Sequence, residues 1–157
     1  MNLDYLTYAL LGGLAIGLLV SVYTDVRYRM IYNKVTLPIA LAAPIYWYAT
    51  GDLADWSIPI HLVTAIGVFA FFALFFSFGM MGGGDVKLFA ALALWFSWTK
   101  IITMVLVASL LGGAVTIAFF AVHKLRKKKG APRIPYGVAI SLAGLWAISE
   151  PFFNHFG

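Results

Sequence analysis

Cysteine is absent from this sequence, and charged residues are scarce. With no cysteine among the 157 residues, disulfide bonds, thiolate metal ligands and thiol nucleophiles are all excluded. Only three histidines occur, and their wide separation fits no metal-ligand spacing, so we expect no metal site and no cofactor. Charged residues make up only 11% of the chain and hydrophobic residues 62%. Because soluble domains carry about a quarter charged residues, this composition indicates that lipid is the solvent.

Apolar runs divide the chain into six segments and predict an all-α fold. We expect a polytopic membrane helical bundle with six transmembrane helices, forming a single domain over residues 1–157. A span needs about 20 apolar residues, so around the short second and fourth segments either the bilayer thins or the helices extend into the loops. No basic run precedes the first segment, which indicates a retained span rather than a signal peptide. The segments are Leu3–Tyr23, Val35–Thr50, Ile58–Phe78, Val86–Trp98, Ile101–His123 and Tyr136–Phe153.

Basic residues predict the orientation of this bundle. Ten of the eleven Lys and Arg residues fall in the first, third and fifth loops, and Lys100 alone falls on the other side. The positive-inside rule therefore places these loops in the cytoplasm and both termini outside. The five tryptophans lie toward the external border, as expected for an aromatic belt. The basic residues lie between apolar segments rather than along one face, so we expect membrane lipid and no nucleic acid as a partner.

Two of the six acidic residues differ from the others in their position. Asp25 ends the first apolar segment and Asp85 opens the fourth, which places both at the cytoplasmic border. The other four acids lie near external borders, where water is available. Asp is favoured at helix N-termini, so a solvated cap is one interpretation of Asp85. The other interpretation is a functional pair of carboxylates.

Three glycines, Gly82, Gly83 and Gly84, come directly before Asp85. Glycine costs a helix interior about 1 kcal/mol per residue, so this stretch predicts an irregular, hydrated pocket beside a carboxylate. Glycine also lets another extended backbone come near, since it has no side chain. On a helix, Lys87 points away from Asp85, which favours a snorkelling or substrate-facing role for its amine.

Three motifs in this chain resemble those of the type IV prepilin peptidases. Gly82-Gly83-Gly84-Asp85-Val86-Lys87 fits the Gly-x-Gly-Asp-x-Lys motif of that family. Asp25-Val26-Arg27, continuing to Ile31 and Asn33, is similar to its first motif, although Tyr32 stands where the family often has proline. Pro135-Tyr136-Gly137 is similar to a further signature that opens the last span. The small size is most similar to the short branch that serves Tad or Flp pili.

This resemblance implies an intramembrane aspartic endopeptidase of the inner membrane with its active site at the cytoplasmic face. It would remove the leader peptide of prepilins or pseudopilins. We expect no N-methylation, because the cysteine-bearing insertion of the bifunctional members is absent. Asp25 and Asp85 are the implied catalytic pair. The implied substrate-binding or site-shaping residues are Gly82, Gly83, Gly84, Lys87, Arg27, Asn33, Pro135, Tyr136 and Gly137.

Other classes of membrane protein also use buried acids. A proton-coupled transporter could use the two aspartates as a relay, but it should place them near the midplane and show inverted repeats. A presenilin-like protease shares the Gly-x-Gly-Asp element, but its other acid would follow a tyrosine, whereas Thr24 precedes Asp25. A non-catalytic scaffold would leave the three glycines unexplained. The sequence does not determine the oligomeric state or which aspartate acts as the base.

Overall fold

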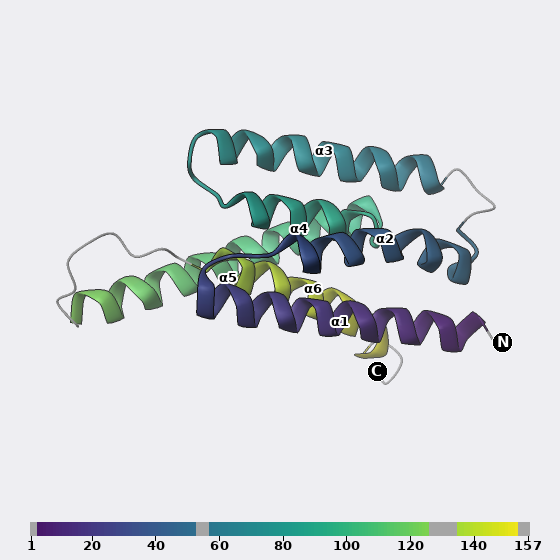
Figure 1. Ribbon diagram of the computed structural model, residues 1–157, viewed down its shortest axis with the longest axis horizontal. Coiled ribbons are helices and arrows are strands. Elements are labelled where there is room, and N and C mark those ends of the chain that lie inside the picture. Colours follow the sequence, from purple (N-terminus) through teal and green to yellow (C-terminus); the bar gives the residue numbers. More distant parts are fainter. Residues whose placement is uncertain (1–2, 53–56, 126–134, 154–157) are drawn as a thin grey trace.

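Six α-helices and no β-strand make up the described part of the chain, residues 3–52, 57–125 and 135–153 of a computed structural model (Figure 1). Three of the helices, α1, α3 and α5, are long and apolar enough to cross a bilayer, and α6 is a shorter apolar helix. The predicted all-α membrane bundle of six helices is thereby confirmed. The helices are α1 Leu3–Tyr28, α2 Asn33–Thr50, α3 Ser57–Ser77, α4 Gly83–Ala93, α5 Trp98–Leu125 and α6 Tyr136–Phe153.

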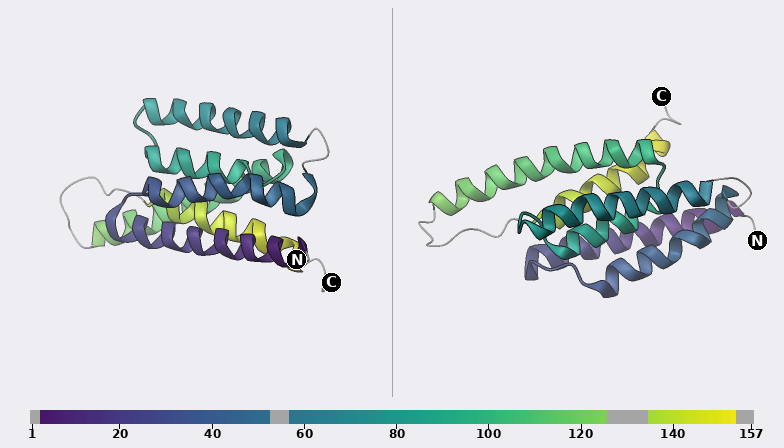
Figure 2. Two further views of the ribbon diagram at one scale, coloured as in Figure 1. Left: turned by 45° about the vertical axis from the view of Figure 1, so that its right-hand side comes forward. Right: turned by 90° about the horizontal axis from the view of Figure 1, so that it is seen from above.

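Consecutive helices run in opposite directions along the bundle (Figures 1 and 2). The last turns of α1 and α3 therefore lie at the same end as the first turns of α2, α4 and α6, on the left in Figure 1. The start of α1 and the end of α6 lie at the opposite end. This arrangement brings Asp25, near the end of α1, and Asp85, near the start of α4, to one end of the bundle.

The short helix α4 lies at the centre of the bundle, packed against α2, α3 and α6. Seven of its eleven residues are buried, and Leu88 and Leu92 are fully enclosed. Gly144 of α6 faces this helix closely, because a Cβ there would lie 3.4 Å from Leu92 Cδ1 and 3.0 Å from Leu18 Cδ1 of α1. Small residues allow membrane helices to approach in this way. Gly144 thus marks the point where the three helices that carry the motifs meet.

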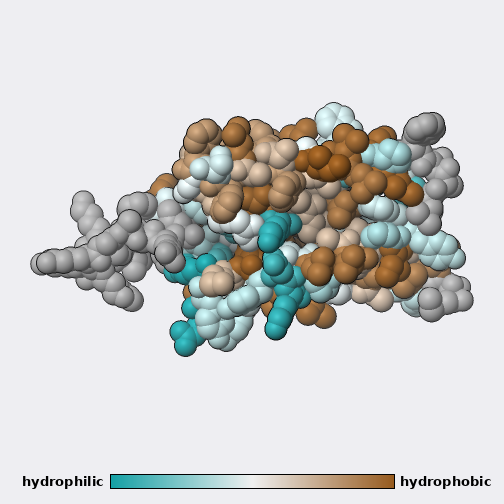
Figure 3. Space-filling model, turned by 45° about the horizontal axis from the view of Figure 1, so that its top comes forward, coloured by the Kyte–Doolittle hydropathy of each residue, from teal (hydrophilic) through white to brown (hydrophobic). Residues whose placement is uncertain are grey.

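The outer surface is largely apolar, as expected for a bundle in lipid. Helix α3 buries only Ala65 among its residues and exposes a series of Phe, Val, Ile and Leu side chains. In Figure 3 hydrophobic residues cover most of the visible face, and the strongly hydrophilic ones gather in its left half. Since this view keeps the left–right direction of Figure 1, that half is the one where α4 begins.

The limits of α4 correct the sequence prediction. The expected segment was Val86–Trp98, but the helix begins at Gly83 and ends at Ala93, before a turn that leads into α5. Indole N–H groups take part in this early ending. Trp47 Nε1 donates a hydrogen bond to the Leu94 carbonyl, and Trp95 Nε1 donates one to the Ile39 carbonyl, both at 2.8 Å. An apolar segment can end inside the bundle because the Trp47 indole satisfies the Leu94 carbonyl in place of water, while the Trp95 indole holds the turn against α2.

The two tryptophans also correct the expected aromatic belt. Trp47 and Trp95 are 4% and 3% exposed, so they belong to the core between α2 and α4 and do not face the lipid border. Trp98 and Trp146 are exposed, and Trp56 lies outside the described residues. Sequence position gave the level of these side chains along the bundle but not the direction in which each one points.

We expect Trp95→Phe to lower the free energy of unfolding by about 1–3 kcal/mol. The change keeps an aromatic ring but removes the buried hydrogen bond from the indole to the Ile39 carbonyl, together with part of the buried ring, and these two losses cost about that amount. Denaturant titration of the purified protein in detergent micelles would measure the loss. Trp98→Phe is the matched control, since Trp98 is 57% exposed. An equal loss in both variants would contradict the role of the hydrogen bond.

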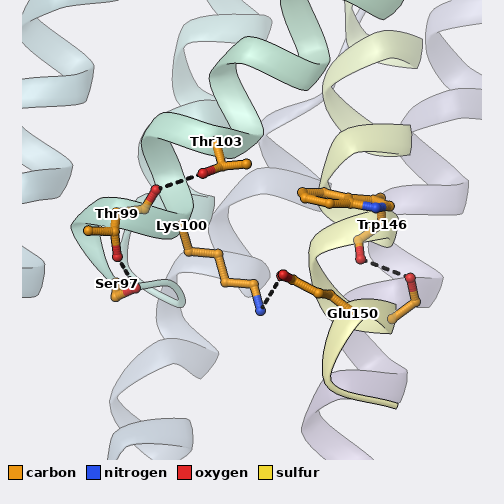
Figure 4. A network of polar contacts seen from close by, with 7 residues as sticks. Ser97, Thr99, Lys100, Thr103, Trp146 and Glu150 are labelled. Carbon is orange, nitrogen blue, oxygen red and sulfur yellow. Dashed lines mark hydrogen bonds and ion pairs between the residues drawn. The ribbon is translucent and has the colours of Figure 1, made fainter. Parts of the chain in front are cut away.

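An ion pair joins α5 to α6 at the end away from the aspartates. Lys100 Nζ lies 3.1 Å from a Glu150 carboxylate oxygen, close to hydrogen bonds among Ser97, Thr99 and Thr103 (Figure 4). Both charged side chains are partly exposed, and such pairs contribute only about 0.2–1 kcal/mol. This pair is therefore a peripheral contact and a convenient control for substitutions at the other end.

Candidate active site

Asp25 lies where the end of α1 meets the start of α6. Its carboxylate is buried, at 5% exposure, and Oδ2 accepts a hydrogen bond of 3.2 Å from the Val138 N–H. N–H groups in the first turn of a helix have no partner within that helix, so they readily bind an anion. The buried hydroxyls of Ser21 and Thr24 bond to carbonyls of α1 itself. Helix α6 thus supplies a hydrogen-bond donor to Asp25, which itself belongs to α1.

Asp85 is the third residue of α4 and is 9% exposed. Its Oδ2 accepts a hydrogen bond of 3.2 Å from the Gly82 N–H, the residue before the helix. The carboxylate also lies at the positive end of the helix dipole, which stabilises negative charge. The capping interpretation of Asp85 is therefore correct in its hydrogen bond, but the side chain is buried and not solvated.

The packing of α1, α4 and α6 brings the two aspartates within electrostatic reach of each other, so that the charge of Asp25 acts on Asp85. Ile31, in the loop after α1, lies between the motif glycines. A Cβ at Gly84 would be 2.9 Å from the Ile31 carbonyl oxygen. A Cβ at Gly137 would be 2.5 Å from Ile31 Cδ1 and 2.9 Å from Asp25 Oδ2. The close approach of three motifs around one residue therefore depends on the absence of side chains at these two glycines.

The three glycines before Asp85 do not form the irregular stretch that the sequence predicted. Gly83 and Gly84 are the first two residues of α4, and only Gly82 has an extended backbone. The helix tolerates them because close packing favours glycine at this end. A Cβ at Gly83 would lie 3.3 Å from the Phe76 ring, and the Ile31 main chain occupies the space beside Gly84. The neighbouring backbone that the glycines admit is thus a segment of this same chain.

Arg29 is the cation of the first motif region that acts on Asp25, whereas Arg27 was the arginine expected among the site-shaping residues. The positive charge of Arg29 reaches the Asp25 carboxylate. Arg27 is exposed and lies over the Tyr28 ring, with its guanidinium carbon 5.8 Å from the ring centre. The chain turns at Arg29, which has a left-handed backbone with φ of 56°. A helix that ends at Tyr28 redirects the next side chains, and sequence spacing could not reveal that change.

Lys87 and Asn33 form a contact separate from the aspartates. Lys87 Nζ donates a hydrogen bond of 2.9 Å to Asn33 Oδ1, which links α4 to the first residue of α2 on an exposed surface. This position agrees with the expectation that Lys87 points away from Asp85 on the helix. The structure therefore brings these two candidate residues together, and their role toward a substrate stays a prediction.

The last motif contributes one residue to the aspartates and another to a neighbouring helix. Pro135 is buried just before α6, Gly137 packs against Asp25, and the Tyr136 ring faces α5, where a Cβ at Gly112 would lie 3.6 Å from it. All three residues were predicted from the sequence, whereas Ile31 as the shared neighbour and the Val138 N–H as a donor were not. A main-chain donor has no side-chain signal in a sequence.

Two buried carboxyl groups at the same end of the bundle suit acid–base chemistry. Both cannot carry a negative charge easily, so the pair is expected to share one proton. An ionised carboxylate can accept a proton from water, and a protonated one can donate to a carbonyl oxygen or a leaving amine. Within the described residues no group of three or more His, Cys, Asp or Glu side chains is placed to hold a metal ion.

Comparisons with known proteins identify relatives of this chain. Similar proteins include prepilin leader peptidase/N-methyltransferases from Dickeya chrysanthemi (27% identical over 88% of this chain and 54% of the relative), Legionella pneumophila (26%, over 86% and 48%) and Aeromonas hydrophila (30%, over 74% and 42%). The chain thus spans about half the length of these relatives. No solved structure matches it. The model of the type IV leader peptidase family matches residues 13–117, about two thirds of the chain, including both aspartates. This chain belongs to the type IV leader peptidase family.

Proposed function

We propose that this protein is an intramembrane aspartic endopeptidase that removes the leader peptide of prepilins or pseudopilins. The observation that carries the proposal is the meeting of Asp25 and Asp85 at one end of the bundle, each with a main-chain N–H bound to its carboxylate. Membership in the leader peptidase family and the names of the similar proteins support this substrate class. A proton-coupled transporter would hold the two acids near the midplane of the membrane, whereas Asp25 and Asp85 lie at helix ends.

The charges around the pair indicate how the two carboxyl groups divide the chemistry. Burial disfavours a charge on Asp25, but the Val138 N–H and the positive charge of Arg29 both favour its ionised form. A negative Asp25 disfavours a second charge on Asp85. We therefore assign Asp25 as the base that takes a proton from the attacking water. Asp85 donates its proton to the carbonyl oxygen as the water adds. In the next step Asp25 passes the proton that it took from the water to the leaving amine, and Asp85 recovers a proton from a hydroxyl of the tetrahedral intermediate as the C–N bond breaks.

The site would face the cytoplasm. Arg27, Arg29, Lys34 and Lys87 all lie in or beside the helix ends that carry the aspartates, whereas Lys100 lies at the opposite end. The positive-inside rule assigns the end with more basic residues to the cytoplasmic side. In this orientation both chain termini lie outside the inner membrane, and peptide cleavage occurs at the inner border.

Two finer parts of the proposal concern the substrate branch and the second activity. We infer a Flp- or Tad-type prepilin as substrate, because the chain resembles the short branch of the family. We also infer that these 157 residues cleave without N-methylation, since they contain no cysteine. Analysis of the reaction product tests both inferences, because leader removal and N-methylation change its mass by different amounts.

The purified protein in liposomes is expected to remove the leader from a Flp-type prepilin. Product formation is followed by the shift on a gel and by intact mass, with S-adenosylmethionine present as a methyl donor. We expect a mature pilin with an unmodified N-terminus. The same prepilin with its leader glycine replaced by valine is the control and should stay uncut. An unchanged wild-type prepilin would contradict the peptidase, and a methylated product would contradict the single activity.

A further inference from the structure

An apolar groove lies next to the aspartate pair, between α3 and α4 on one side and α5 and α6 on the other. Its volume is about 510 Å³. Exposed residues such as Met80, Gly113 and Ile117 line it, so the groove opens to the surface of the bundle. None of the side chains that line it is charged. The chemistry proposed above makes no use of this space.

One end of the groove reaches the catalytic motifs. Met81 lines it and precedes Gly82, whose N–H binds Asp85. Tyr136 lines it and precedes Gly137, which packs against Asp25. From there the groove follows α5 from residue 117 back to residue 108, a rise of about 14 Å at 1.5 Å per residue. An occupant lying along this path would therefore end beside both carboxyl groups.

Five of the six α5 residues that line the groove are small, and Ile117 is the sixth. Ala108, Gly112 and Thr116 follow one another at intervals of four, and Ser109 and Gly113 form a second row beside them. A Cβ at Gly113 would have no neighbour within 4 Å, so no other part of the described chain fills the space before it. Rows of small residues at this spacing are surfaces on which another membrane helix packs closely.

The opposite wall is aromatic. Phe72 of α3 stacks on Phe89 of α4 at 4.3 Å between ring centres, with only 4° between the ring planes. Phe75 lies beside them on the same helix face. A small-residue wall facing an aromatic wall suits large aliphatic side chains on one face of an entering helix. Within hydrocarbon an occupant peptide must be helical, because its own backbone groups have to be satisfied internally.

We propose that this groove binds the apolar helix of the substrate that adjoins the scissile bond. The inference rests on the proposed function, because it takes the cut polypeptide as the occupant. A peptide bond presented to Asp25 and Asp85 at the membrane border must continue into lipid on one side. The groove offers that segment an uncharged path that begins at the pair. It thereby aligns the bond by binding a remote part of the substrate, which is an efficient way to position a reacting group.

A second groove of similar size is less suited to this role. It has a volume of about 560 Å³ and lies among α2, α3 and α4. Its polar end is formed by Lys87 and Asn33, which bond to each other. Neither Met81 nor Tyr136, the residues that join the first groove to the aspartates, lines it. A helix there would end at the Lys87 face of α4, which points away from Asp85.

Site-specific cross-linking tests the proposal, since the sequence has no cysteine of its own. Gly113→Cys is introduced together with Asp85→Asn, which keeps the prepilin uncut. The prepilin carries one cysteine, moved along its apolar helix, and a bismaleimide joins the two. We expect adducts with Gly113→Cys that recur every three to four positions of the prepilin helix. The controls are Gly67→Cys on the exposed face of α3 and Ile66→Cys in the second groove.

The outcomes separate this inference from the proposed function. Leader removal by the unmodified protein is measured in parallel with the same prepilin. Removal without a Gly113→Cys adduct, or with adducts at Ile66→Cys or Gly67→Cys instead, overturns the groove assignment alone. No removal by the unmodified protein overturns the proposed function and the groove with it. As a second measure, Gly113→Leu should lower kcat/KM about tenfold by filling the groove, whereas Gly67→Leu should leave it unchanged.

Discussion

Replacing either Asp25 or Asp85 by asparagine is expected to abolish leader removal. Asparagine keeps the shape of the side chain, and its Oδ1 can still accept the Val138 or Gly82 N–H. It cannot take up or release the proton that the reaction needs. Since a positioned acid or base contributes about 10²–10⁴-fold, each single change should reduce the rate by at least about that factor. Cleavage of a co-expressed prepilin, followed on a gel, measures the effect.

The pair should behave as one unit in this experiment. Because both groups serve the same proton transfers, the double variant should be little slower than either single one. Glu150→Gln is the matched control, as it neutralises an acid at the far end of the bundle, where Glu150 pairs with Lys100. It should cleave at the normal rate. Full cleavage by Asp25→Asn or Asp85→Asn, at equal amounts in the membrane, would refute the catalytic pair.

Gly137→Ala is expected to lower kcat by about 10²-fold while the protein still accumulates in membranes. The new methyl group would meet Ile31 Cδ1 at 2.5 Å and the Asp25 Oδ2 and Cγ atoms at 2.9 and 3.1 Å. Asp25 therefore has to move away from the start of α6, and displacement of a catalytic group by about 1 Å costs roughly that factor. Leader removal by the purified variant at saturating prepilin would show the loss in kcat.

A matched glycine and a second change isolate the cause. Gly12→Ala on α1 is the control, because a Cβ there has no neighbour within 4 Å. Its activity should be unchanged. Adding Ile31→Val to Gly137→Ala removes the Cδ1 atom and should restore part of the rate. A Gly137→Ala protein as active as Gly12→Ala would show that the contact with Asp25 does not control the geometry.

The helical architecture could be predicted from the sequence because hydrocarbon imposes a simple rule. Long apolar runs in lipid must satisfy their own backbone groups, so they form helices. The segment predicted as Leu3–Tyr23 is accordingly a helix, although it extends to Tyr28. The limits of α4 were wrong by several residues. Its early end involves hydrogen bonds between Trp47, Trp95 and carbonyls about fifty residues away, which a local pattern does not contain.

For the motif aspartates, too, the sequence predicted one part and the contacts between distant segments decided the other. Sequence alone placed Asp25 and Asp85 at one border, because each adjoins an apolar segment whose direction follows from the alternation of helices. Whether they meet depended on how α1, α4 and α6 pack, and on Ile31 fitting between Gly84 and Gly137. The cation beside Asp25 proved to be Arg29 because α1 ends at Tyr28 and the chain turns there. Residue types and their order thus determined the helices and the candidate acids, whereas only contacts between distant segments decided which groups surround them.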